Sequence, residues 1–115
     1  MGGFKLAGGL WIIAGVNSAG MVFGVWEDGP IMLALALGGA IVGLTIGSLL
    51  VARPRPDVVR WSNVAGITWL IAFGVLTVVE VVMQMGYALA VALHTALGVA
   101  GALVAYWRRG AVASA

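Results

Sequence analysis

Residues 30–60 read PIMLALALGGAIVGLTIGSLLVARPRPDVVR, and this stretch decides the fold. The part from 30 to 52 has no charged residue and exceeds the ~20 residues that a helix needs to cross a bilayer. The part from 53 to 60 gathers three arginines and two prolines, and a proline disfavours helical geometry at the residue before it. The stretch therefore predicts a membrane span that ends in a basic loop.

The same alternation of apolar runs and short polar breaks extends over all 115 residues, of which 63% are hydrophobic and 9% charged. With a mean hydropathy of +1.12, the chain has too few polar residues to cover a soluble domain, so its surroundings must be lipid. We expect a single domain over residues 1–115, an all-α integral membrane bundle of four transmembrane helices. The predicted helices are 4–26, 30–52, 61–84 and 87–107, and the predicted loop is 53–60.

The charged residues predict how these helices are oriented. If the chain forms two in–out–in hairpins, all six Lys and Arg residues fall on one side, whereas Glu27 and Asp28 fall on the other. Cationic residues favour the cytoplasmic side, so both termini are predicted to be cytoplasmic. The excess of Arg over Lys, with abundant Ala, Gly and Val, is typical of a bacterial chain, so we expect the bacterial inner membrane. The cationic residues, which we also expect at lipid headgroups, are Lys5, Arg53, Arg55, Arg60, Arg108 and Arg109.

Two further expectations concern the ends of the chain and its partners. The first apolar run reaches spanning length behind a single basic residue, Lys5, so we interpret it as a retained helix and not as a cleaved signal peptide. The strong charge bias commits the chain to one orientation, so any copies that associate should be parallel. Because the basic residues flank apolar segments, we expect the lipid bilayer and other membrane subunits as partners, and no nucleic acid.

Glycines recur at close spacing on three of the predicted helices, where they allow helix backbones to approach one another. The simpler interpretation is packing inside one four-helix bundle. The alternative is that one stripe, most of all Gly39, Gly43 and Gly47, docks another subunit. The glycines of these candidate packing or oligomer faces are Gly20, Gly24, Gly39, Gly43, Gly47, Gly98 and Gly101.

Polar residues inside the spans form a candidate site. Glu80 is the only acid within a predicted span, and His94 is the only histidine of the chain. At 1.5 Å rise per residue, Glu80, His94 and Asn17 lie about 9, 12 and 15 Å below the outer boundary, so they can meet. Thr77 and Gln84 share one helix face with Glu80. The candidate polar site comprises Glu80, His94, Asn17, Thr77 and Gln84.

This cluster allows two interpretations. A Glu80–His94 pair could share a proton and titrate as a unit, as a proton relay requires. Alternatively, Glu80 extends toward the nearby membrane surface while His94 makes a structural contact between helices. The sequence does not decide between these two roles.

Chemistry beyond this cluster is not expected. The sequence has no phosphate-binding glycine loop, nucleophile elbow or zinc-binding helix motif, so we expect no catalytic residues and no enzyme activity. We also expect no cofactor and no metal, because Glu80 and His94 supply too few ligands. The leading hypothesis is a non-catalytic subunit, either a parallel homo-oligomer or an accessory component of a larger membrane complex. The alternatives are a proton-coupled transporter or channel and, third, a quinone- or haem-binding redox subunit.

Overall fold

The structure is a computed structural model that describes residues 2–25, 29–84 and 86–112. Four long helices follow one another: α1 (Gly2–Gly24), α2 (Pro30–Ala52), α3 (Pro56–Val82) and α4 (Ala88–Trp107), with a short 3-10 helix, η1 (Arg109–Ala111), after α4. Each of the four is long and apolar enough to cross a membrane. Large apolar side chains cover the outside, among them Phe23 at 88% exposure and Trp107 at 83%. The chain is therefore an all-α protein with four candidate membrane spans, and its surface contacts lipid.

The expected start of the third helix is wrong, because α3 begins at Pro56 and not at residue 61, which shortens the loop to residues 53–55. In the first turn of a helix the backbone N–H groups have no partner within the helix, so the missing N–H of a proline costs nothing there. Pro56 therefore begins α3, whereas we expected it to belong to the loop. Asp57 lies in the first turn, where a carboxylate stabilises the positive end of the helix dipole. Its Oδ2 atom lies 3.3 Å from a guanidinium nitrogen of Arg55.

The other expected helix ends lie within two residues of the observed ones where the structure describes them. The first helix begins at Gly2, two residues before its expected start. Its expected end, Trp26, lies outside the described residues. The third helix ends at Val82, and Gln84 follows in a left-handed conformation with φ of 55°. Tyr87 precedes the first turn of α4 as its N-cap.

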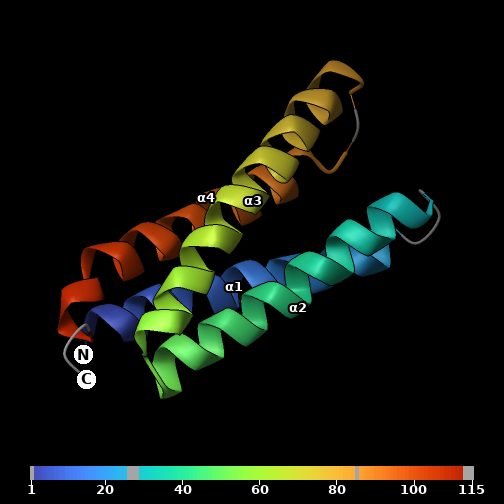
Figure 1. Ribbon diagram of the computed structural model, residues 1–115. Helices are drawn as coiled ribbons and strands as arrows, with labels where there is room; N and C mark the ends of the chain where they lie inside the picture. Colours follow the sequence, from blue (N-terminus) through green and yellow to red (C-terminus); the bar gives the residue numbers. More distant parts are fainter. Residues whose placement is uncertain (1, 26–28, 85, 113–115) are drawn as a thin grey trace.

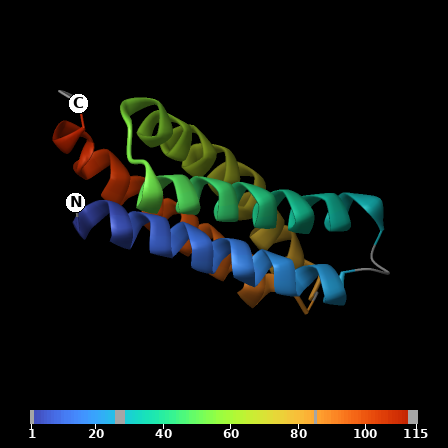
Figure 2. The same ribbon diagram turned by 90° about the horizontal axis from the view of Figure 1, so that it is seen from below.

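The helices form two hairpins that pack side by side (Figure 1). Helix α1 lies between α2 and α4, and α3 packs mainly on α4 (Figure 2). Among helix pairs joined directly along the chain, α2 and α3 share the smallest interface. They meet at the short loop 53–55 and diverge away from it (Figure 1). The bundle is therefore closely packed around α1 and open between α2 and α3.

Glycines allow α1 and α2 to approach closely. A Cβ atom added to Gly43 would lie 2.8 Å from Cα of Gly15, and one added to Gly47 would lie 2.6 Å from the carbonyl oxygen of Gly8. One added to Gly39 would lie 2.6 Å from Oγ of Ser18, also on α1. The stripe Gly39, Gly43 and Gly47 thus faces α1, which occupies the surface that a second subunit would need.

The remaining glycines of the expected packing faces have different surroundings. Gly98 and Gly101 of α4 leave room for the indole ring of Trp11, because a Cβ atom at either position would lie within 3.1 Å of that ring. Gly24 adjoins Tyr87, whereas a Cβ atom at Gly20 would meet nothing within 4 Å. Gly20 therefore lies on the exposed side of α1 and takes no part in the packing of the bundle.

Candidate functional site

The candidate site is a buried polar layer at the middle of the bundle, centred on His94 of α4. Its Nδ1 atom lies 2.6 Å from Oγ of Ser18 and 2.9 Å from the carbonyl oxygen of Ala14, both on α1. His94 and Ser18 are fully buried. Along α1 and α4 this layer lies between two apolar clusters, one around Trp11 and Leu50 and one around Phe73 and Val91.

The imidazole ring of His94 also contacts the two remaining helices. The rings of Phe73 and Trp69, on α3, lie 4.7 and 6.0 Å from it between centroids, in edge-to-face arrangements. On α2, a Cβ atom at Gly39 would lie 3.2 Å from Cε1 of the imidazole. His94 is therefore the point at which all four helices converge, and its environment is a packed one.

The neighbours of Nδ1 determine which nitrogen carries a proton. The carbonyl oxygen of Ala14 can only accept a hydrogen bond, so a proton is needed on Nδ1 to donate to it. With the proton on Nδ1, Oγ of Ser18, 2.6 Å from the same nitrogen, accepts from this N–H as well. The Nε2 atom of His94 makes no hydrogen bond to any described residue. The geometry therefore favours a histidine that binds α4 to α1.

Two more polar contacts join α1 and α4 on the side of the layer toward the hairpin turns. The side-chain amide of Asn17 donates to the carbonyl oxygen of Ala90 at 2.8 Å. The hydroxyl of Tyr87 donates to the carbonyl oxygen of Gly24. Both of these bonds end on a backbone carbonyl oxygen, so the two polar side chains link neighbouring segments of the bundle.

A further polar link ties α1 to α3 in the other half of the bundle. The indole N–H of Trp11 donates to Oγ of Ser62 at 2.9 Å, and both residues are fully buried. A buried indole needs such an acceptor, and Ser62 supplies it without widening the space between the helices. Ser18 and Ser62 were missed by the sequence reasoning, because a single serine in an apolar helix is not distinctive. The spacing of buried positions at 11, 14, 18 and 21 on α1 could have placed Ser18 on the packed face.

The structure places the five residues of the candidate polar site on three helices and in one turn. His94 and Asn17 come together at the α1/α4 interface. Glu80 is fully buried on α3, two helical turns from Phe73 on the same face, whereas the hydrogen bonds of His94 go to α1. Thr77 donates to the carbonyl oxygen of Phe73 in its own helix at 2.7 Å. Gln84 lies exposed in the turn after α3.

The surroundings of the polar layer limit the chemistry that it can perform. Among the described residues, no group of three or more His, Asp or Glu side chains could hold a metal ion. Neither His94 nor Glu80 lines any of five grooves in the described part of the chain. A haem or quinone at His94 would have to displace the rings of Phe73 and Trp69, so the residues present do not fit such a group.

Comparisons of the chain with protein-family models, with curated proteins and with solved structures found no significant match.

Proposed function

We propose that this chain is a non-catalytic subunit of a membrane assembly, either as a parallel homo-oligomer or as an accessory component of a larger membrane complex. The main support for this proposal is that polar side chains inside the bundle form hydrogen bonds between its helices. Trp11, Asn17 and His94 each bond across a helix interface, where they hold the helices in register. Such a bundle presents a well-packed apolar surface to neighbouring membrane subunits.

The open side of the bundle supports the same proposal. Between α2 and α3 lies a groove of about 240 Å³. Beside it the indole of Trp61 is 62% exposed. Helices associate in membranes by close packing and not by a hydrophobic drive, and a groove between two diverging helices accommodates a third helix. We assign the α2/α3 groove to a transmembrane helix of another subunit. It is lined by Val42, Ile46, Trp61, Val64, Ala65, Thr68 and Trp69.

The distribution of charge supports a parallel arrangement. The start of α1 and the end of α4 lie together, since a Cβ atom at Gly3 would meet the side chain of Arg108. The loop 53–55 lies at the same end (Figure 1). All six Lys and Arg residues thus belong to one end of the molecule, which we propose is the cytoplasmic end. Because every copy of the chain has the same charge distribution, all copies should insert into the membrane in the same orientation.

The test is the size of the particle in mild detergent, measured by light scattering. We expect the wild type to form an assembly larger than a monomer, with itself or with a co-purifying membrane protein. Thr68→Trp places bulk in the α2/α3 groove and should reduce that size, whereas Ile13→Trp, on the exposed face of α1, should not. A wild-type protein that is a uniform monomer with no bound partner would contradict the proposal.

A proton-coupled transporter or channel is the second candidate, and the burial of Glu80 favours it. A fully buried acid inside a membrane span is the kind of residue that proton pathways use. Such a protein would carry protons across vesicles under a pH gradient, and Glu80→Gln would remove that flux. A flux that is insensitive to this substitution would remove Glu80 from the pathway.

A further inference from the structure

The outer face of the α3/α4 hairpin carries one long furrow that begins among arginines. Three grooves of about 390, 350 and 340 Å³ succeed one another along it. The first and second share Asn63, and the second and third share Leu70 and Val99, so they form one continuous depression, here called the α3/α4 furrow. The lining of its charged end is Pro56, Val59, Arg60, Asn63, Arg109 and Gly110.

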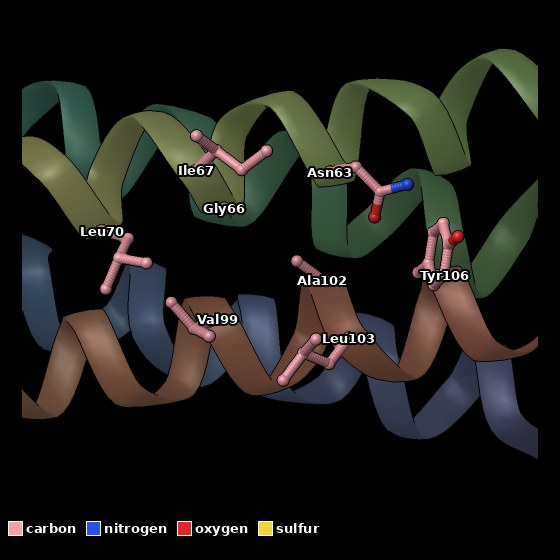
Figure 3. A pocket seen from close by; sticks show the side chains of 8 residues that line it. All are labelled: Asn63, Gly66, Ile67, Leu70, Val99, Ala102, Leu103 and Tyr106. Carbon is pink, nitrogen blue, oxygen red and sulfur yellow. The ribbon is translucent and has the colours of Figure 1, made fainter.

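The middle of the furrow is apolar and is formed by the facing sides of α3 and α4 (Figure 3). Its floor is narrow because Gly66 lies against Ala102, where an added Cβ atom would come within 2.5 Å of the alanine methyl. Its walls are formed by long side chains such as Leu70 and Leu103, which are 48% and 59% exposed. Farther along, Gly74 keeps the furrow wide, since a Cβ atom there would meet nothing within 4 Å.

The furrow is long enough to follow one leaflet of a bilayer from the headgroups to its middle. From Arg60 to Leu70 the helix rises by about 15 Å, at 1.5 Å per residue. Half of the ~30 Å hydrocarbon core is also about 15 Å. A hydrocarbon chain whose head lies beside Arg60 would therefore reach the middle of the membrane near Leu70 and Val99, with its end beside Gly74 one helical turn farther along.

The charged end of the furrow presents two guanidinium groups. Arg109 lies over the ring of Tyr106, 3.8 Å from the ring centroid, and donates to the carbonyl oxygen of the same residue at 2.8 Å. This contact fixes the position of Arg109 and uses one of its five N–H donors. Arg60 approaches from α3 and is exposed. Guanidinium donors match phosphate oxygens in charge and in planar geometry.

We propose that the α3/α4 furrow binds one molecule of an anionic phospholipid, with its phosphate between Arg60 and Arg109 and an acyl chain along Gly66, Leu70 and Val99. The change from cationic to apolar lining along one depression is complementary to such a lipid. A transmembrane helix in the same place would leave both guanidinium groups without a counter-charge. Basic pockets beside transmembrane helices bind anionic headgroups for this reason.

The test is lipid retention in native mass spectrometry, with delipidated protein titrated with phosphatidylglycerol or phosphatidylcholine. The wild type should bind one phosphatidylglycerol about tenfold or more tightly than phosphatidylcholine, since each arginine near the membrane surface contributes about 1 kcal/mol toward an anionic lipid. The double variant Arg60→Gln, Arg109→Gln should lose this preference. The control Arg53→Gln, Arg55→Gln removes the same charge from the same end and should keep it. Equal affinity for both lipids, or equal loss in both double variants, would overturn the proposal.

A second pair of variants tests the apolar part of the furrow without changing charge. Gly74→Leu fills the furrow and should weaken retention of phosphatidylglycerol, whereas Gly20→Leu, on an open face of α1, should not. If Gly74→Leu reduces the size of the assembly and leaves lipid retention unchanged, a helix and not a lipid occupies the furrow. This result would overturn the lipid proposal and leave the proposed subunit role intact.

Discussion

The Nδ1 atom of His94 lies 2.6 Å from Oγ of Ser18, and both side chains are fully buried where the four helices converge. Ala14 adds a carbonyl oxygen at 2.9 Å from the same nitrogen. The only histidine of the chain is therefore held by α1, and its ring is enclosed by aromatic side chains of α3. These contacts identify His94 as a structural link between helices.

If this link holds the bundle together, Ser18→Ala should reduce stability. The substitution removes one buried hydrogen bond between α1 and α4, and we expect the free energy of unfolding to fall by about 0.5–2 kcal/mol. The measurement is unfolding in mixed detergent micelles followed by circular dichroism. Ser48→Ala is the matched control, because Ser48 is exposed on α2 and should change little. Equal effects of both substitutions would count against the link.

The packing of α1 on α2 leads to a second expectation. A methyl group at Gly43 would lie 2.8 Å from Cα of Gly15, so Gly43→Ala must push the helices apart and should cost about 1–3 kcal/mol of unfolding free energy. Gly20→Ala meets nothing within 4 Å and should be neutral or stabilising by up to about 1 kcal/mol. If Gly43→Ala leaves the fold intact but dissociates an oligomer, the glycine stripe faces another subunit after all.

Substitution of one residue in the turn between α3 and α4 should raise the stability of the fold. Gln84 has φ of 55°, a left-handed conformation that costs most residues about 1–2 kcal/mol and glycine almost nothing. Gln84→Gly should therefore raise the free energy of unfolding by about 0.5–1 kcal/mol. Met83→Gly, one residue earlier at φ of −85°, gains no such relief and should be destabilising. The same unfolding assay compares the two variants, and the opposite order would contradict the assigned turn.

The orientation can be measured with single cysteines, since the chain has none of its own. Gly86 and Ala111 are exposed and lie at opposite ends of α4. In intact cells a membrane-impermeant maleimide should label Gly86→Cys and leave Ala111→Cys unlabelled until the membrane is disrupted, because cationic ends stay in the cytoplasm. Labelling of Ala111→Cys alone would reverse the proposed topology.

The sequence predicted the helices well because the hydrophobic length of a span and the charge at its ends are local properties. The predicted start of α3 was wrong because a proline can either end a helix or begin one. Only the fold shows that Pro56 begins α3. The partners of His94 could not be predicted for a different reason. The position of a residue along the chain predicts its depth in the membrane and the helix face on which it lies. Which helix lies against that face depends on how the glycines of all four helices fit together.

The surroundings of Glu80 could likewise be predicted only in part from the sequence. Its burial could be expected from the polar face of its helix, yet its distance from His94 along the bundle depends on the relative shift of α3 and α4. Phe73, two turns from Glu80, is the α3 residue that contacts the imidazole. An aromatic ring of α3 thus packs on the imidazole of His94, a contact that the sequence did not suggest.

The most direct test of the proposed role is proton flux into vesicles that contain the purified protein, driven by a pH gradient and reported by an internal dye. If the buried polar residues serve packing, wild-type vesicles and Glu80→Gln vesicles should both match protein-free vesicles. A wild-type flux clearly above that background, abolished by Glu80→Gln in a protein that still folds, would contradict the non-catalytic subunit and establish a proton pathway.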